Sequence, residues 1–248
     1  PLFKIEVSIL NDHAMITLDT SGAGLHKRGY RKDSTKAPIK ETLAAGMLLI
    51  SHWKKDRALL DPFCGSGTFP IEAALMAANI APGMHRSFLA EEWKNLIAKR
   101  EWYDCIDEAN DMVDLKVETD IQGYDMDERM VSIARENARL AGVDHLIHFQ
   151  TREVAALSHP KKYGFVITNP PYGERLEEKA NLKPLYATIG ERFKMLDSWS
   201  LYMITAYEEA EADMGMKADK NRKIYNGMMK TRFYQFPGPK PPRRDNKR

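Results

Sequence analysis

Short apolar segments alternate with helical patterns along most of the chain, and this alternation constrains the fold more than any other feature. The expected strands are Ala58–Leu60, Ile121–Tyr124, His145–Phe149, Gly164–Thr168 and Ser200–Thr205. The expected helices are Ile39–Trp53, Phe69–Ala78, Glu128–Ala141 and Tyr186–Leu196. Strands that alternate with helices form a mostly parallel sheet with helices on both faces. The sequence therefore predicts an α/β fold, and 248 residues are enough for one large domain with a full core.

Two hairpin patterns flank this alternating region. Phe3–Leu10 and Ala14–Leu18 largely alternate apolar and polar residues and predict an N-terminal strand pair. Near the other end, Lys223–Tyr225 and Lys230–Gln235 flank Asn226-Gly227, a dipeptide typical of tight turns between strands. A terminal hairpin there would add an antiparallel edge to the sheet.

The chain divides into three expected regions. Residues 1–36 hold the strand pair and a basic loop, residues 37–236 the α/β domain, and residues 237–248 a basic, proline-rich tail. We interpret the tail first as solvated and disordered, and second as a phosphate-binding arm. Within the domain, the charged segment Met84–Asp120 is expected to be a helical insertion, and the sequence does not reveal its role.

Cysteines, histidines and apolar runs narrow the protein class. Cys64 and Cys105 cannot form a disulfide framework or a cysteine-rich metal site, and the histidines lack metal-ligand spacing, so no metal is expected. No apolar run approaches the roughly 18 residues that span a bilayer, and no signal peptide is recognisable. We expect a cytoplasmic protein without a membrane partner. Because the chain starts at Pro1 rather than methionine, it is expected to be a fragment or to lack residues at its start.

A glycine loop, Asp61–Thr68, follows the first strand of the domain and opens its helix. Gly65 and Gly67 allow positive φ and a close approach of backbone to ligand, and the helix N-terminus can hold an acceptor group. Alone, such a loop also fits a dinucleotide site or a tight turn. A phosphate loop does not fit, because no Gly-Lys-Ser/Thr follows Gly67. Asp61 would repel a diphosphate, but its charge suits a sulfonium or an α-amino group.

Two further acids follow the next strands. Asp125 comes directly after the second strand, where a carboxylate can accept both hydroxyls of a ribose, and Glu153 follows the third, where it can accept from an adenine amine. The carboxyl ends of parallel strands meet at one edge of the sheet, so the acids and the glycine loop are expected together. The alternatives are a solvated strand-end acid for Asp125 and an ordinary surface residue for Glu153.

The tetrapeptide Asn169-Pro170-Pro171-Tyr172 follows the fourth strand. Two prolines fix the backbone and remove two donors, which leaves the Asn169 side-chain oxygen and the Pro170 carbonyl as acceptors. Acceptors that grip the hydrogens of an exocyclic base amine favour a tetrahedral nitrogen able to attack a sulfonium methyl group. Tyr172 can stack on the base. In isolation the motif also fits an ordinary turn with a core tyrosine.

Carbon methylation of a pyrimidine would need a nucleophilic cysteine. Cys64 lies in the glycine loop and Cys105 in the insertion, so neither belongs to the tetrapeptide loop. Both are interpreted as structural. The pattern therefore favours transfer to nitrogen.

With these motifs in view, the sequence resembles the bacterial class I methyltransferases that modify guanine N2 in large-subunit ribosomal RNA, often labelled N6-adenine-specific methylases. The matching segments are Leu18–Arg31, Ala37–Leu48, Leu59–Glu72, Ala81–Arg86, Gly123–Asp127, Thr168–Arg175 and Lys223–Gln235. The resemblance implies a Rossmann-like seven-stranded sheet with a reversed final hairpin and S-adenosylmethionine as cofactor. The implied cofactor-binding residues are Asp61, Pro62, Cys64, Gly65, Gly67, Thr68, Asp125, Met126 and Glu153, with Pro38, Lys40, Glu41 and Thr42 at the methionine end. Asn169, Pro170, Pro171 and Tyr172 would hold the amine.

The resemblance also implies an upstream THUMP-type RNA-binding domain, to which the strand pair Phe3–Leu18 would be the junction. At the third cofactor acid, where family members commonly have aspartate, this chain has Glu153.

A basic cluster with an interleaved tyrosine is typical of an RNA-contacting surface. It comprises His26, Lys27, Arg28, Tyr30, Arg31 and Lys32. We expect Lys27, Arg28, Arg31 and Arg175 to contact RNA, and a solvated loop is the alternative. The leading hypothesis is a guanine-N2 methyltransferase of 23S ribosomal RNA. The alternatives are adenine-N6 methylation of RNA or DNA, and a non-catalytic RNA-binding or assembly module.

Overall fold

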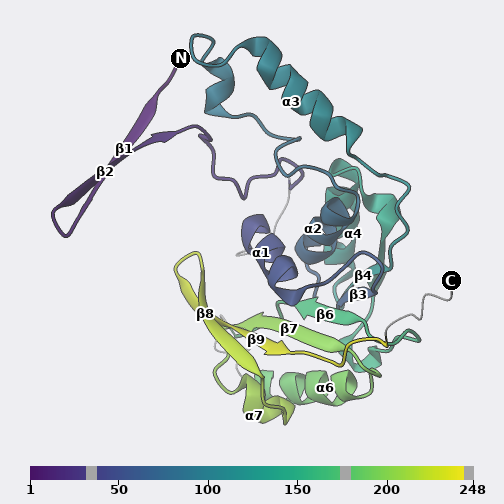
Figure 1. Cartoon of the computed structure of the whole chain (residues 1–248). Coiled ribbons are helices and arrows are strands. Elements are labelled where there is room, and N and C mark those ends of the chain that lie inside the picture. The colour runs from purple at the N-terminus through teal and green to yellow at the C-terminus, as the bar shows by residue number, and fades with distance from the viewer. Residues whose placement is uncertain (32–37, 174–179, 243–248) are drawn as a thin grey trace.

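The chain folds around one large mixed sheet (Figure 1). The computed structural model describes residues 1–31, 38–173 and 180–242. The strands, in the order in which they lie side by side, are β5 Ile147–Thr151, β4 Ile121–Asp125, β3 Leu59–Asp61, β6 Phe165–Thr168, β7 Ser200–Thr205, β9 Met229–Phe236 and β8 Lys220–Asn226. The first five are parallel, whereas β9 is antiparallel to β7 and to β8. The predicted seven-stranded, mostly parallel sheet with a terminal antiparallel hairpin is confirmed.

The strand order reverses at the centre of this sheet. From β3 the chain continues to β4 and β5 on one side, and then returns to β6 and β7 on the other. Open α/β sheets bind ligands at such a reversal, in the crevice beyond the carboxyl ends of the strands. Asp61 and Thr168 end the two strands that flank the reversal. The topology alone therefore marks this point as a candidate site.

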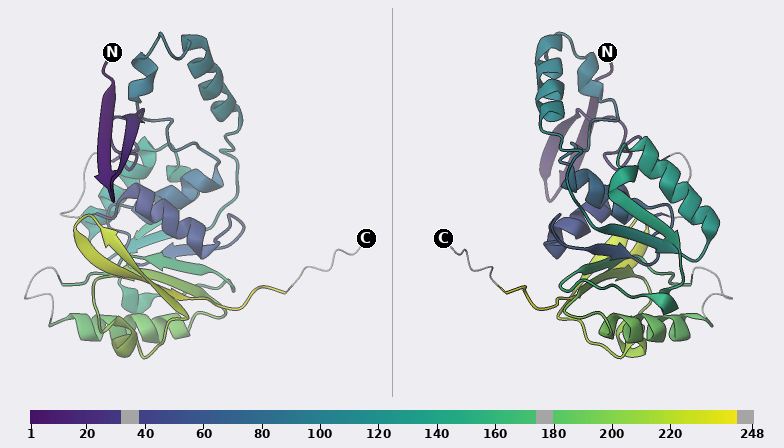
Figure 2. Two further views of the ribbon diagram at one scale, coloured as in Figure 1. Left: turned by 60° about the vertical axis from the view of Figure 1, so that its left-hand side comes forward. Right: turned by 90° about the vertical axis from the view of Figure 1, so that its right-hand side faces the viewer.

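Helices cover both faces of the sheet (Figures 1 and 2). One face carries α1 Glu41–Ser51, α2 Thr68–Ala77 and α4 Glu128–Leu140, and the other carries α6 Leu182–Lys194 and α7 Ala210–Met214. Helix α2 has nine of its ten residues buried, because it packs between the sheet, α1 and α4. None of the helices in the described ranges is long and apolar enough to cross a membrane.

Element boundaries shift by a few residues from those expected. Strand β5 starts at Ile147 rather than His145, because Asp144–Leu146 form a 3-10 turn that leads into it. Helix α6 starts at Leu182, four residues before the expected Tyr186. Pro184 lies in its first turn, where a missing N–H costs no intrahelical hydrogen bond. In both places the local backbone conformation, and not the apolar pattern, sets the start of the element.

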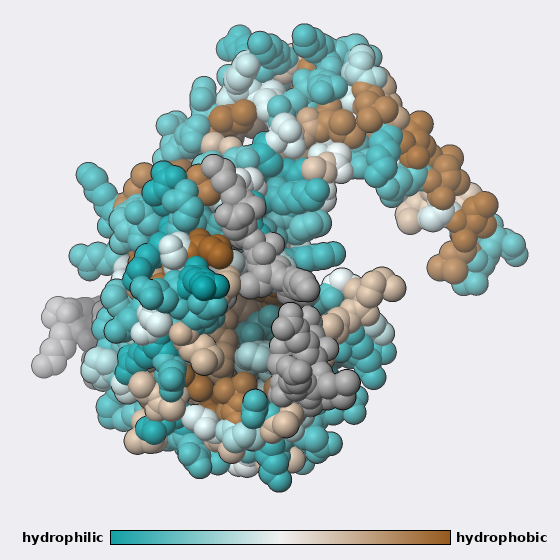
Figure 3. All heavy atoms as spheres, turned by 180° about the vertical axis from the view of Figure 1, so that it is seen from behind, coloured by the Kyte–Doolittle hydropathy of each residue, from teal (hydrophilic) through white to brown (hydrophobic). Residues whose placement is uncertain are grey.

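The N-terminal strands β1 Lys4–Leu10 and β2 His13–Asp19 form a separate two-stranded sheet that projects from the body, which confirms the predicted strand pair. Every residue of β1 is exposed. Apolar side chains on this arm appear as brown patches in Figure 3, and they include Ile5 at 61% exposure and Ile16 at 72%. The hairpin therefore contributes little to the core of the domain.

The segment of residues 84–120 holds the base of this hairpin and contains helix α3 Lys99–Asp111. The Trp93 ring stacks on Phe3 with centroids 4.9 Å apart, and its indole N–H donates to the Leu2 carbonyl at 2.9 Å. Trp93 is 2% exposed, so the contact is fully packed. The structure thus gives the insertion a role that the sequence did not reveal.

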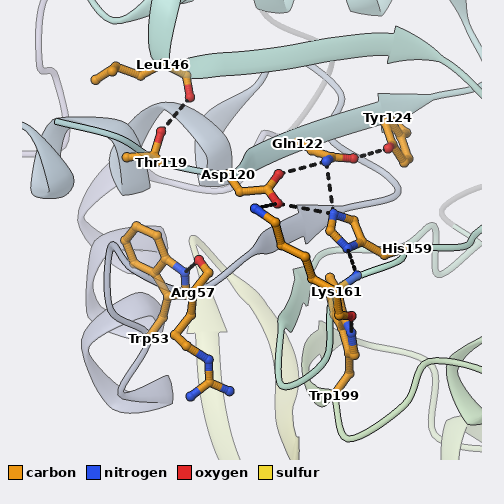
Figure 4. Close-up of polar contacts among 10 residues, drawn as sticks. All are labelled: Trp53, Arg57, Thr119, Asp120, Gln122, Tyr124, Leu146, His159, Lys161 and Trp199. Carbon is orange, nitrogen blue, oxygen red and sulfur yellow. Dashed lines mark hydrogen bonds and ion pairs between the residues drawn. The ribbon is translucent and has the colours of Figure 1, made fainter. Parts of the chain in front are cut away.

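A polar cluster lies at the start of β4, at the end of the sheet opposite to the carboxyl ends of the parallel strands (Figure 4). Asp120 accepts from Gln122 Nε2 at 2.8 Å and pairs with Lys161 Nζ at 2.7 Å. His159 Nδ1 accepts from the Lys161 backbone N–H at 3.1 Å, and burial lowers the pKa of this histidine. The Trp199 indole donates to the Lys161 carbonyl at 2.8 Å. These groups are satisfied by one another, at the edge of the sheet away from the strand reversal.

Candidate active site

Asp61 lies at the centre of the candidate site. Its side chain is 1% exposed, and Oδ1 accepts from Thr168 Oγ1 at 2.6 Å and from the Phe63 N–H at 3.1 Å. Burial raises the pKa of this carboxyl to about 7, although both hydrogen bonds oppose the shift. Among the described residues no cation forms an ion pair with Asp61. A cationic ligand would favour its ionised form.

Thr168 connects this acid to the tetrapeptide loop. It is fully buried as the last residue of β6, and it immediately precedes Asn169. Because its hydroxyl is bonded to Asp61, the start of the loop is fixed relative to the end of β3. Thr168 was not among the site residues expected from the sequence. The available signal was a hydroxyl at the end of an otherwise apolar strand.

The two glycines of the loop have different surroundings. Both have positive φ, 50° at Gly65 and 88° at Gly67. A Cβ on Gly67 would lie 3.1 Å from side-chain atoms of Ala134 and Phe149, whereas a Cβ on Gly65 would meet nothing within 4 Å. Gly67 therefore serves the packing of the loop onto the domain. Gly65 faces open space, as a glycine next to a ligand would.

Three other expected cofactor residues turn inward. Pro62, Cys64 and Thr68 are buried. The Cys64 N–H donates to the Tyr124 carbonyl at 2.8 Å, and burial raises the pKa of its thiol. Their side chains pack against the domain and expose little surface. A ligand would therefore contact mainly backbone atoms in this part of the loop.

Asp125 joins the end of β4 to the glycine loop. Its Oδ2 accepts from the Gly65 N–H at 3.0 Å, its Oδ1 accepts from the Asp127 N–H at 3.0 Å, and burial raises its pKa. Each carboxylate oxygen retains a further acceptor position. The neighbouring Met126 is 76% exposed.

Glu153 lies at the end of the adjacent strand. The Arg152 N–H donates to the Asp125 carbonyl at 2.8 Å, which brings the residue after β5 next to the end of β4. Glu153 itself is exposed and starts a short 3-10 turn. Its carboxylate is therefore accessible at the same sheet edge as Asp125.

A buried tyrosine, Tyr186, anchors the tetrapeptide loop by a hydrogen bond. Tyr186 donates to the Pro171 carbonyl at 3.1 Å, and its hydroxyl lies 2.5 Å from Thr205 Oγ1 at the end of β7. Asn169 is half-buried, and its side chain has no hydrogen-bond partner within the ranges that the structure describes. Pro170 is buried and Tyr172 is half-buried. The side-chain amide of Asn169 is therefore available to a substrate, at the start of a loop that Tyr186 anchors at Pro171.

Glu72 organises a buried ionic cluster behind the loop. It is the single charge in the apolar helix α2 and is 3% exposed. Arg28 Nη2 lies 3.3 Å from Glu72 Oε2, and the Tyr30 hydroxyl donates to Oε1 at 3.0 Å. Burial raises the pKa of Glu72, and the Arg28 charge opposes this shift. A lone acid in an apolar helix was the sequence signal for this cluster.

Arg31 extends the cluster to the first turns of α1 and α2. It donates to Thr68 Oγ1 at 2.5 Å and to the Ile39 carbonyl at 3.3 Å, and Nε lies 3.4 Å from Glu41 Oε1. Glu41 is 4% exposed. Two arginines therefore balance two buried acids.

This cluster turns two of the residues expected to contact RNA, Arg28 and Arg31, toward the interior. Arg28 is 9% exposed and Tyr30 is 1% exposed, because both turn toward the buried carboxylate of Glu72. Arg31 likewise points inward, whereas Lys27 is exposed. Arg175 lies outside the described residues.

A hollow of about 410 Å³ separates the basic loop from the start of α1. Its lining combines residues expected at the methionine end of the cofactor with residues of the basic cluster. They are His26, Lys27, Arg28, Gly29, Arg31, Pro38, Lys40 and Glu41. Thr42 is exposed on the first turn of α1. No group of three or more metal-binding side chains occurs in the described ranges.

Comparison with known proteins defines the family. The sequence model of the UPF0020 family, described as an RMKL-like methyltransferase domain, matches residues 28–235. The chain belongs to this family. Membership confirms the resemblance and the enzyme class predicted from the motifs, a methyltransferase.

Relatives within this methyltransferase family are close in sequence and structure. The "Putative RNA methyltransferase YpsC" of Bacillus subtilis is 47% identical over 234 residues, 94% of this chain and 60% of the relative. The ribosomal RNA large subunit methyltransferase K/L of Shewanella baltica is 42% identical over 237 residues, 93% of this chain and 33% of the relative. A structure described as "a possible methylase from Clostridium difficile 630" is 50% identical with a TM-score of 0.92, covering 97% of this chain and 63% of the other.

A structure described as "SMU.472, a putative methyltransferase complexed with SAH" is 44% identical with a TM-score of 0.89, covering 97% of this chain and 63% of the other. Together with the family match, this SAH-bound neighbour implies S-adenosylmethionine as the cofactor. The chain spans about 60% of the length of the Bacillus relative and a third of the Shewanella one.

Proposed function

We propose that the protein transfers a methyl group from S-adenosylmethionine to an exocyclic base amine in RNA, namely guanine N2 of 23S ribosomal RNA. One observation carries the proposal. The Thr168–Asp61 hydrogen bond joins the end of β6, which begins the tetrapeptide loop, to the end of β3, which begins the glycine loop. An amine-holding loop and a cofactor loop therefore meet at the strand reversal, where such sheets bind ligands.

The residues at the reversal fit the cofactor. Gly65 faces open space, Asp125 retains acceptor positions for ribose hydroxyls, and Asp61 is a buried acid without a cation of its own. Met126 and Glu153 offer exposed surface on the adenine side, and the segment Pro38–Thr42 would lie toward the methionine end. When bound, S-adenosylmethionine supplies an electrophilic methyl group on a sulfonium.

The tetrapeptide loop activates the amine by position. Asn169 Oδ1 and the Pro170 carbonyl accept its two hydrogens, which favours a tetrahedral nitrogen whose lone pair points at the methyl carbon. The N–C bond forms as the S–C bond breaks, and the nitrogen then releases a proton to water. Tyr172 stacks on the base. This chemistry needs no strong general base.

The names of two relatives support RNA as the substrate, whereas guanine N2 rests on the resemblance of the sequence motifs alone. The Shewanella relative is named a ribosomal RNA large subunit methyltransferase and the Bacillus relative an RNA methyltransferase. A Listeria structure, 48% identical, is described as a predicted N6-adenine-specific DNA methylase. The loop chemistry serves either amine. Nucleoside mass spectrometry of 23S ribosomal RNA from a deletion strain separates them, because loss of N2-methylguanosine is expected and an unchanged level would overturn guanine as the target.

Residues 1–36 are proposed to connect the methyltransferase domain to a THUMP-type RNA-binding domain, in a cytoplasmic protein. Two observations support this assignment. The family match begins at residue 28, after the hairpin, and β1 is exposed along its whole length.

Replacing Asn169 tests the mechanism. Asn169→Ala removes an acceptor that acts on the amine and leaves the Asp61–Thr168 bond in place. We expect turnover on unmodified 23S ribosomal RNA to fall by about 10²-fold or more, with the calorimetric Kd for S-adenosylmethionine nearly unchanged. Turnover equal to that of the unaltered protein would contradict the role assigned to Asn169.

A further inference from the structure

The terminal hairpin overhangs the candidate active site. Thr205, the last residue of β7, pairs with Arg232 of β9, and three more pairs of the β8–β9 ladder continue beyond it. The hairpin therefore extends roughly 10 Å past the carboxyl edge of the sheet. Its loop is Gly227-Met228, one residue later than predicted, and Gly227 has φ 64° as the first position of a two-residue hairpin loop often requires.

One face of the overhang is basic and carries an aromatic ring. Lys223 pairs with Arg232 and Tyr225 with Lys230, so these four side chains share a face. All four are exposed, Tyr225 by 56%, and the Lys223 ammonium lies 5.3 Å from the tyrosine ring centroid. We call these four residues the hairpin face.

The cations of the hairpin face have no acid partner. Within residues 1–31, 38–173 and 180–242 none of them forms an ion pair, and Arg232 donates only to the Asn221 side chain, at 3.2 Å. Glu208 lines the same small hollow as Lys230 and Arg232, outside ion-pair distance. The face therefore carries three cations, Lys223, Lys230 and Arg232, that form no ion pair among the described residues.

The hairpin face is connected to the tetrapeptide loop through buried hydroxyls. The hollow next to Lys230 and Arg232 is also lined by Thr205, which contacts Tyr186, the donor to the Pro171 carbonyl. Two strand spacings separate β9 from β6, about 10 Å. The charged face is therefore within one or two nucleotides of a base held by Asn169.

We infer that the hairpin face binds the RNA strand next to the target nucleotide, with Lys223, Lys230 and Arg232 on phosphates and Tyr225 stacked on a neighbouring base. The inference rests on the proposed function, because it states where the RNA substrate of that reaction binds. Phosphates complement three unpaired cations, and exposed tyrosines among cations stack on unpaired bases in a sequence-tolerant way. Unlike Arg28 and Arg31, which pair with buried acids, these cations are exposed.

A matched pair of variants tests the hairpin face. Lys230→Ala/Arg232→Ala removes one lysine and one arginine from the face, and Lys220→Ala/Arg222→Ala removes the same charges from the opposite face of the same hairpin. Fluorescence anisotropy with an unmodified 23S ribosomal RNA transcript gives Kd over a series of KCl concentrations. For the face variant we expect the slope of log Kd against log salt to fall by about 1.4, because each phosphate contact to a single strand contributes about 0.7. The control should keep the slope. Equal slopes for the two variants would overturn the inference.

Tyr225 separates stacking from charge. Tyr225→Ala should raise the Kd for the same transcript by about fivefold or more, and Tyr225→Phe, which retains the ring, should leave it within twofold. Equal effects of both substitutions would refute stacking. Binding is read independently of methyl transfer, so a protein that binds through the face but transfers no methyl group overturns the proposed function alone. A protein that methylates the transcript while the face variant binds normally overturns only the hairpin inference.

Discussion

The loop around Arg28 and the β8–β9 hairpin have similar compositions and opposite structures. Both interleave tyrosine with arginine and lysine. In the loop, Arg28 and Tyr30 turn inward to Glu72, and Arg31 turns inward to Glu41. In the hairpin, no acid of the described chain meets the cations on the overhanging face. The two basic segments differ because Glu41 on α1 and Glu72 on α2 are buried acids that form ion pairs with the arginines of the loop.

The same comparison can be made among the buried acids of the protein. Glu72 and Glu41 are buried acids that form ion pairs with Arg28 and Arg31, whereas Asp61 is a buried acid with no such partner among the described residues. Charges that the chain balances itself stabilise the fold, and charges left unbalanced mark where ligands of opposite charge bind. By this criterion Asp61, in the proposed cofactor site, resembles the hairpin face, and the Arg28 cluster does not.

The largest predicted effect concerns the balanced cluster. Arg28→Ala leaves Glu72 buried without its counter-charge, and removing one partner of a buried pair costs about 3–5 kcal/mol. We expect Tm to fall by about 10 °C in thermal unfolding. Lys27→Ala is the control, since this neighbouring cation is exposed and its loss should leave Tm nearly unchanged. Equal, small shifts in the two variants would show that Arg28 is a surface cation after all.

The sequence predicted the sheet well because strand and helix periodicities are local. It also predicted which loops meet at the strand reversal, since parallel strands bring their carboxyl ends to one edge. It misjudged Arg28 and Tyr30 because their partner, Glu72, lies more than 40 residues away on a helix whose burial depends on tertiary packing. Thr168 and Tyr186 were missed for the same reason. Their hydrogen bonds to Asp61 and Pro171 join segments that only the fold brings together.

An intermediate effect is expected at the unbalanced acid. The folded pKa of Asp61, about 7, lies above the ordinary value of 3.8, so the unliganded protein binds this proton more tightly than the unfolded chain does. Asp61 therefore lowers stability progressively as pH rises from about 4 to 7, and Asp61→Asn removes that dependence. A cationic ligand binds the ionised acid, whose fraction rises about fivefold between pH 6 and pH 7, so affinity for S-adenosylmethionine should rise about fivefold over this range.

Calorimetry across this window provides the test, below the pH at which an α-amino group titrates. The Asn variant, which can still accept from Thr168, should bind more weakly at pH 7 with a flat profile. A wild-type affinity that does not change between pH 6 and pH 7 would mean that Asp61 does not face the cationic part of the cofactor.

The smallest effect is expected for the stability of the hairpin variants. Lys230→Ala/Arg232→Ala removes two exposed cations without ion pairs, so no buried group loses a partner. The same substitution also reduces like-charge repulsion with Lys223. We expect Tm to change by no more than about 2 °C, in the same protein preparation whose RNA binding loses salt dependence. A loss of several degrees would instead show that these cations support the fold, as Arg28 does. The hairpin cations would then stabilise the fold, and the proposed difference between them and the paired Arg28 would be contradicted.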